Sequence, residues 1–144
     1  MSAVENREVV RRLVEEFWNK RNAAVLDDVF APNFLNHNPP FGSPPDREGL
    51  KHANNMFLAA FSEIHTAIDD LITEGDKVVW RWTFSGRNTG PLADMPATGK
   101  QVNMTGIVID RIVGGQIVER WSEMDIFGLM QQLGAIPTAR EAGG

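Results

Sequence analysis

The sequence lacks cysteine and contains three histidines, His37, His52 and His65. Without cysteine the chain has no disulfides, thiol nucleophiles or thiolate metal ligands. The histidines form neither a His-Glu-x-x-His pattern nor a closely spaced pair, so we expect no metal site. Glycine-rich phosphate loops and Gly-x-Ser-x-Gly elbows are missing too, which leaves nucleotide hydrolysis and the usual serine-hydrolase scheme without support.

Positive charge and long apolar runs are also scarce. The 14 Lys and Arg residues are outnumbered by 19 Asp and Glu residues, giving a net charge of -5, whereas nucleic-acid affinity comes largely from clustered basic residues. No segment approaches the roughly 20 apolar residues that cross a bilayer, and the amino terminus lacks the apolar part of a signal peptide. We therefore expect a soluble, cytoplasmic protein without nucleic-acid or membrane partners, its residues 1–144 forming a single domain.

The first part of the chain carries helical patterns. Apolar residues at three- and four-residue spacing predict an amphipathic helix over residues 5–20. A short helix is expected over 25–30, ended by Pro32, and a third helix should run from an Asp46 cap to about residue 61. Between the last two helices we expect a short strand-like piece over 34–38 and a stiff, proline-rich loop.

Strand patterns follow from residue 63 onward. Positions 64, 66, 68, 70 and 72 share one parity, and a turn at 74–76 leads into a strand with Trp80, Trp82 and Phe84 on one face. A second hairpin turns at Gly114-Gly115, and its last strand, to residue 125, enters a short helix over 126–133. The loop over 88–99 is predicted to be a lid, because Leu92, Met95 and Pro96 are apolar.

Helices first and strands afterwards favour an α+β fold, with one curved antiparallel sheet wrapped around three helices. A cone of this kind with an incompletely filled interior provides a ligand cavity. Aromatic and methionine residues are mostly expected in the core, and some of them at the cavity wall.

Five phrases in order along the chain resemble the SnoaL-like polyketide cyclases of the nuclear transport factor 2-like superfamily. They are NHNPP (36–40), REGLK (47–51), DLITEGDKVV (70–79), MPATGK (95–100) and DIFGLMQQLG (125–134). The resemblance implies a homodimeric α+β cone that binds a polyketide or ester-like hydrophobic substrate. It further implies ring closure by intramolecular aldol chemistry with no metal or organic cofactor.

The resemblance also implies a set of site residues. In such cyclases an aspartate on the last long strand removes a carbon-bound proton, while a histidine on the preceding strand and an asparagine near the start of the sheet position the reactants. The asparagine corresponds to Asn36. Counted back from the 128–134 phrase without gaps, the aspartate and histidine positions hold Ser122 and Val108, which replace neither a carboxylate nor an imidazole in proton transfer.

Other groups are therefore the candidate catalytic residues. His37 has polar neighbours and a proline-stiffened support, so it carries a proton or is structural. Asp125 either carries a proton or caps the helix that follows it. Arg120 shares the face of Ser122 and either binds a carboxylate or enolate oxygen or forms a salt bridge at the rim. Glu123 falls on the opposite face unless a bulge shifts the register.

We expect the ligand to touch Asn36, Phe17, Trp18, Trp82, Met104, Val108, Ser122 and Met124. Trp121 is expected on the outer face of the sheet as a dimer contact. The sequence thus predicts a cofactor-independent enzyme that acts by general acid-base chemistry, with His37, Asp125 and Arg120 as its catalytic residues. A non-catalytic protein that binds a hydrophobic ligand, and a hydrolase or isomerase of the same fold, remain as alternatives.

Overall fold

The computed structural model describes residues 2–136. Its helices and strands, in chain order, are α1 Ala3–Arg12, the π-helix η1 Leu13–Asn19, α2 Val25–Val29, β1 Phe30–Asn36, the 3-10 turn η2 Pro40–Gly42, α3 Arg47–Ala60, β2 Phe61–Glu74, β3 Lys77–Asn88, β4 Gln101–Val113, β5 Gln116–Met124 and α4 Ile126–Leu133. The predicted α+β fold with a curved sheet is confirmed.

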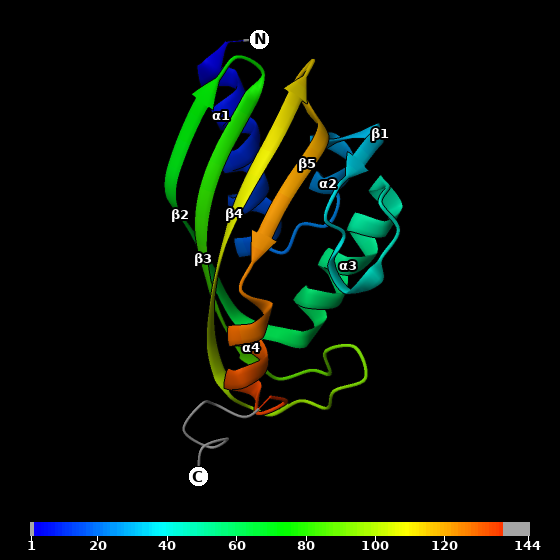
Figure 1. Ribbon diagram of the computed structural model, residues 1–144, viewed down its shortest axis with the longest axis vertical. Helices are drawn as coiled ribbons and strands as arrows, with labels where there is room; N and C mark the ends of the chain where they lie inside the picture. Colours follow the sequence, from blue (N-terminus) through cyan, green and yellow to red (C-terminus); the bar gives the residue numbers. More distant parts are fainter. Residues whose placement is uncertain (1, 137–144) are drawn as a thin grey trace.

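The five strands form one sheet in the order β1-β5-β4-β3-β2. Helices α1, α2 and α3 lie on one side of this sheet, and α4 lies across its lower end (Figure 1). Strands β2 to β5 pair in antiparallel fashion, but β1 pairs with β5 in parallel. The strand patterns of the sequence predicted one antiparallel sheet and did not predict this parallel pairing, which brings the amino-terminal third of the chain beside the last strand.

The first predicted helix is two structures in succession. The side chain of Ser2 accepts a hydrogen bond from the backbone of Glu5 at 3.2 Å and caps α1. The helix then widens into the π-helical η1, a form that is often associated with functional sites. In this segment Phe17 is fully buried and Trp18 is partly buried.

The region around Pro32 forms a strand where a terminated helix was predicted. Helix α2 ends at Val29, and β1 continues through Pro32 to Asn36. Proline has no backbone donor, but β1 is an edge strand, where a missing donor is tolerated. The predicted strand-like piece therefore begins earlier and ends earlier than expected.

Bulges in β2 break its simple alternation. The pairing of β2 with β3 shifts register between Ser62 and His65 and again between Ile68 and Asp70. The second shift puts Leu71 against the core and leaves Ile72 63% exposed. The predicted single parity from residue 64 to residue 72 is therefore wrong beyond Ile68.

The loop between β3 and β4 packs against α4 and does not cover the interior of the cone. Leu92 is 1% exposed and belongs to a core cluster with Leu129 and Leu133 of α4. The backbone N–H of Leu92 donates to the carbonyl of Met95, and the N–H of Met95 donates to the carbonyl of Leu92, both at 2.9 Å. No residue of this loop lines the cavity described below, so the expectation of a lid is wrong for that cavity.

Candidate functional site

A cavity of about 80 Å³ lies between the concave face of the sheet and the helices. Three residues of α3 at helical spacing, Leu50, Asn54 and Phe57, form one wall. The remaining lining residues are Trp18, Asn36, Pro40, Thr66, Trp80, Trp82, Phe84, Met104, Val108, Arg120, Ser122 and Met124. Arg120 is the one charged residue among these described lining residues, and most of the others are apolar.

A tryptophan and a glycine form part of the cavity floor on the sheet. Trp82 and Gly106 are paired across β3 and β4. A Cβ atom at position 106 would lie 2.2 Å from Cζ2 of Trp82, so the indole ring lies directly over the backbone there. Only glycine leaves room for this arrangement, which gives the floor a flat aromatic surface.

Arg120 is held in place by a buried ion pair. Its Nε and Nη2 donate to the two carboxylate oxygens of Asp110 at 2.7 and 2.9 Å, and Trp80 Nε1 donates to the same carboxylate at 3.0 Å. The guanidinium carbon lies 5.1 Å from the ring centroid of Phe30 and 5.8 Å from that of Trp80. Nη1 has no hydrogen-bond partner within residues 2–136, so it can donate to a ligand.

The end of β1 is tied to β5 by asparagine side chains. Asn38 Oδ1 accepts from the backbone of Ser122 at 2.9 Å, and Asn36 Oδ1 accepts from the backbone of Asn38 at 3.1 Å. The backbone of His37 also donates to the carbonyl of Arg120 at 2.9 Å. These bonds fix Asn36 at the cavity wall beside the inward face of β5, with its Nδ2 amide directed to no other described group.

The structure brings together most of the residues predicted at the site. Those that line the cavity are Trp18, Asn36, Trp82, Met104, Val108, Arg120, Ser122 and Met124. Phe17 does not line it: its ring is fully buried and packs edge-on against Trp18 at 4.9 Å. Phe17 therefore supports the cavity wall from behind.

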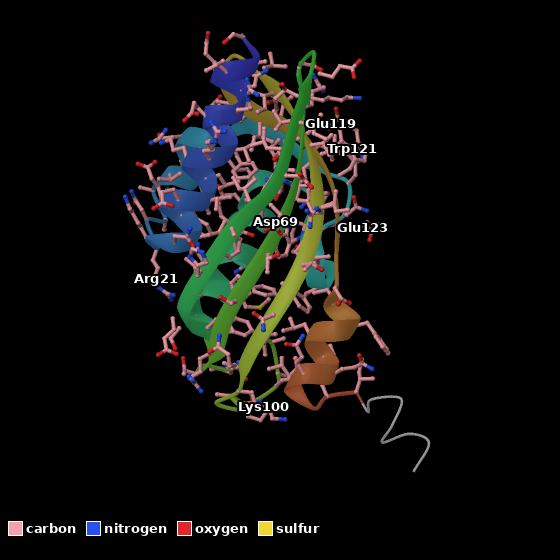
Figure 2. All side chains as sticks on the ribbon, turned by 90° about the vertical axis from the view of Figure 1, so that its left-hand side faces the viewer. Arg21, Asp69, Lys100, Glu119, Trp121 and Glu123 are labelled. Carbon is pink, nitrogen blue, oxygen red and sulfur yellow. The ribbon has the colours of Figure 1, made fainter. Side chains whose placement is uncertain are left out.

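His37 lies on the opposite face of the sheet. Its Nε2 is 2.7 Å from Glu119 Oε2, and its ring stacks on Trp121 with centroids 4.7 Å apart. Figure 2 shows Glu119, Trp121 and Glu123 along β5 on the side away from the helices. Arg111 also donates to Glu119, at 2.8 Å, and these two partners, Arg111 first and His37 second, hold the pKa of the Glu119 carboxyl below its usual range.

Asp125 and Glu123 also lie outside the cavity lining. Asp125 caps α4, because its Oδ1 accepts from the backbone of Gly128 at 2.9 Å. The pairing of β4 with β5 is regular from Gly106 to Arg111, so no bulge turns Glu123 inward and its side chain is exposed. The N-cap prediction for Asp125 is confirmed. Neither His37 nor Asp125 is among the residues that line the cavity, so nothing in its geometry supports a catalytic role for either.

Three polar residues of the site escaped the sequence analysis. Asp110 alternates with Val108 on the inner face of β4, Thr66 alternates with Ile64 on β2, and Asn54 is four residues from Leu50 on α3. The spacing of each residue from its apolar neighbours indicates that it faces the interior. None of the three was predicted at the site, because a polar residue among apolar ones does not by itself mark a cavity wall. Within residues 2–136 no group of three His, Asp or Glu side chains is arranged to hold a metal ion, and no described helix is long and apolar enough to span a bilayer.

Comparisons with known proteins agree with this architecture. A model of the SnoaL-like polyketide cyclases matches residues 8–133. The aklanonic acid methyl ester cyclase DnrD of Streptomyces peucetius is 32% identical over 136 residues, which cover 88% of this chain and 89% of that protein. This chain belongs to the SnoaL-like polyketide cyclase family. The family resemblance inferred from the sequence phrases is thereby confirmed.

Solved structures share the fold of this chain. TsrD from Streptomyces laurentii matches with a TM-score of 0.84 at 31% identity, covering 94% of this chain and 99% of that one. A protein of Catenulispora acidiphila with a ketosteroid isomerase-like fold matches with a TM-score of 0.69 at 18% identity over 88% of this chain and 92% of its own. The second likeness concerns the fold alone.

Proposed function

We propose that this protein is a cofactor-independent ring-closing enzyme that acts on a polyketide ester, with Arg120 stabilising the enolate formed in its cavity. The observation that carries the proposal is the position of Arg120. A guanidinium fixed by Asp110 at the wall of an apolar cavity has a donor nitrogen left for a ligand oxygen. Ester or ketone oxygen atoms gain negative charge when a neighbouring carbon loses its proton, so this donor favours the enolate over the ketone.

The surroundings of Arg120 increase this effect. Phe30 and Trp80 flank the guanidinium with their aromatic rings. Beside apolar walls a fixed charge interacts more strongly than in bulk solvent, and its preorganisation by Asp110 avoids a reorganisation cost during the reaction. Asn36 Nδ2 and the hydroxyl of Ser122 lie at the same wall and supply further donors for substrate oxygens.

Proton transfer in this proposal uses water. Within residues 2–136 no Asp, Glu or His lines the cavity. Carbon acids between two carbonyls need less basic assistance once their enolate is stabilised. The proton leaves the carbon for a water molecule, which becomes hydronium. The enolate carbon then attacks a ketone carbon, and the resulting alkoxide takes the proton back from the hydronium, which regenerates the water. Substrate and product therefore have the same composition.

Aklanonic acid methyl ester is the first substrate to test, because a curated relative of 32% identity is named for it. Purified protein is incubated with this ester, and a product of identical mass but different retention is sought by liquid chromatography and mass spectrometry. Arg120→Met alone would leave Asp110 buried without its counter-charge. The double variant Arg120→Met/Asp110→Leu removes both charges and should fold, since buried pairs are often replaceable by apolar residues. We expect it to lose turnover, whereas full activity in the folded double variant would refute the role of Arg120.

A second candidate function is supported by the same lining. A cavity without carboxylate or imidazole suits a protein that binds and carries a hydrophobic compound without converting it. Native mass spectrometry of protein purified from its own host distinguishes the two. A co-purifying compound that binds Arg120-dependently and is returned unchanged supports the carrier function.

The outer face of the sheet supports the proposal that the protein is a homodimer. Ile72, Val79, Ile109 and Trp121 are paired in one row across four strands. Ile107 on the same face is 51% exposed. An apolar row bordered by charged side chains is typical of an interface. Light scattering after size-exclusion chromatography tests this proposal. We expect the wild-type protein to have the mass of a dimer and Ile107→Glu to have the mass of a monomer. A monomeric mass for the wild-type protein would refute the dimer. A cytoplasmic location also stays a prediction.

A further inference from the structure

A phenylalanine in the loop between β1 and α3 has an unusual backbone conformation. Phe41 lies in the 3-10 turn η2 with φ 54° and ψ 31°, and Gly42 after it is also left-handed, with φ 70°. L-residues other than glycine rarely adopt this conformation, and a bulky side chain makes it rarer still. Strained residues persist only where the surrounding structure holds them, and they concentrate at ligand clamps and switch regions. The strain at Phe41 therefore points to a role for its side chain.

The loop on the carboxyl side of Phe41 is firmly held. The backbone nitrogen and the hydroxyl of Ser43 both donate to the carbonyl of Pro40, at 3.1 and 2.8 Å, and close the turn around Phe41. A Cβ atom at position 49 would lie 2.1 Å from the carbonyl oxygen of Pro44, so the loop packs directly on the first turn of α3, where only Gly49 leaves room. With the backbone held in this way, the freely rotating part of the turn is the ring of Phe41.

The same loop connects β5 to α3 beside the cavity (Figure 1). Asn38 accepts from the backbone of Ser122 on β5 at 2.9 Å, and the ring of Phe41 lies 5.8 Å from that of Phe57 on α3. Pro40 and Ser122 line the cavity and are half-buried, so part of each remains open to solvent. The cavity therefore reaches the protein surface beside this loop.

Three aromatic rings run from solvent to the cavity at this point. The ring centroids of Phe41 and Phe57 are 5.8 Å apart, and those of Phe57 and Phe84 are 6.3 Å apart. The exposed fractions of the three side chains fall in that order from 42% to 5% and 3%. Phe57 and Phe84 line the cavity, whereas Phe41 does not. Phe41 is thus the outermost ring of the row and stands between the cavity wall and water.

We propose that Phe41 is the gate of the cavity: its ring covers the entrance beside the loop and rotates away to let a ligand in or out. The left-handed backbone directs the ring onto Phe57. Since the ring is already half exposed, its outward rotation removes little apolar contact. Exposed side chains change rotamer within nanoseconds, so access requires no opening of the loop itself. The gate concerns entry alone and holds whether the protein converts its ligand or only carries it.

Acrylamide quenching of tryptophan fluorescence tests the gate without a ligand. Trp121→Phe serves as the common background, because the remaining indoles all line the cavity and belong to Trp18, Trp80 and Trp82. If the ring leaves the entrance open for no more than about a third of the time, Phe41→Ala should raise the bimolecular quenching constant at least about threefold. Phe127→Ala is the matched control, because Phe127 on α4 is 61% exposed and does not line the cavity. It should leave the quenching constant unchanged.

Phe41→Gly separates loss of the gate from loss of stability. Glycine removes the same ring but tolerates the left-handed backbone, so Phe41→Gly should melt about 2–4 °C above Phe41→Ala. Both variants should nevertheless be quenched equally. Quenching that stays at the background value in both variants would overturn the gate. So would an increase in Phe41→Ala alone, because access would then follow the lower melting temperature rather than the missing ring.

Discussion

The two faces of β5 hold ion pairs of different kinds. On the inner face Arg120 pairs with Asp110, whose side chains are 11% and 0% exposed. On the outer face Arg111 pairs with Glu119, whose side chains are 35% and 23% exposed, and His37 joins them. The alternation of the strand sends neighbouring charges into opposite environments. Loss of one partner of the inner pair would leave an unpaired charge beside the cavity and destabilise the fold. The outer pair is screened by solvent and contributes less to the free energy of unfolding.

The largest effect should come from breaking the inner pair on one side only. Asp110→Asn leaves Arg120 buried without a counter-charge, so we expect the free energy of unfolding to fall by about 3–5 kcal/mol in urea denaturation. The matched change on the outer face, Glu119→Gln, should cost far less at neutral pH. A loss below about 1 kcal/mol for Asp110→Asn would mean that the inner pair is no more important than a surface pair.

The next effect concerns the cavity floor. Gly106→Ala places a methyl group where the Trp82 ring lies, and overpacking of this kind costs about 1–3 kcal/mol. Displacement of the indole should also change the near-ultraviolet circular dichroism. Gly86→Ala is the control on the same strand pair, because its nearest side-chain atoms are 3.3 Å away. Unchanged spectra for Gly106→Ala would show that the Trp82 ring does not lie over the backbone of Gly106.

A smaller effect separates capping from catalysis at Asp125. Asp125→Ala should lower the free energy of unfolding by about 1 kcal/mol, whereas Asp125→Asn keeps the cap and should be nearly neutral. If aklanonic acid methyl ester is turned over, both variants and His37→Ala should retain that turnover, because neither residue lines the cavity. Loss of turnover in Asp125→Asn with stability intact would restore Asp125 as a proton carrier.

The smallest effect is the acid response of the outer pair. The pKa of Glu119 is lowered in the folded protein by Arg111 and His37. Its contribution to stability is therefore present above the unfolded pKa, about 4.3, and is lost as the pH falls through the lower folded value. Urea midpoints measured from pH 6 to pH 3 should fall less steeply for Glu119→Gln than for wild type. Glu123→Gln is the control, because it makes the same charge change on that face without removing an ion pair. If the urea midpoints of Glu119→Gln and Glu123→Gln fell equally steeply with pH, the ion pairs would not lower the pKa of Glu119.

Most helices and hairpins of the fold could be predicted from the sequence. Periodic spacing, the Asp46 and Asp125 caps and the turns at Gly75 and Gly114 are local signals, and the helices and hairpins that they predicted are present. The parallel pairing of β1 with β5 and the bulges of β2 were missed. Pairing partners far apart in the chain and single-residue register shifts leave no periodic trace.

The candidate site was predicted in part for the same reason. Eight of the expected residues line the cavity. Six of these lie on β3 to β5, where strand parity decides which side chains point inward. Parity also placed Ser122 inside and Glu123 outside, as expected. The position of His37 was not accessible in this way, because it follows the end of β1 and its direction depends on the contacts with Trp121 and Glu119. Asp110, Thr66 and Asn54 were recognisable only once their neighbours were known to face a hollow.

The parallel pairing of β1 with β5 has a consequence for biosynthesis. Asn38 and Ser122, which it places within hydrogen-bonding distance, are 84 positions apart along the chain. Contacts between such distant segments form late, and a chain emerging from the ribosome exposes its unpaired strand edges until they do. The cavity is therefore open during most of translation and acquires its last wall only when β5 arrives, so the nascent chain cannot hold a ligand there before its final strand has been made.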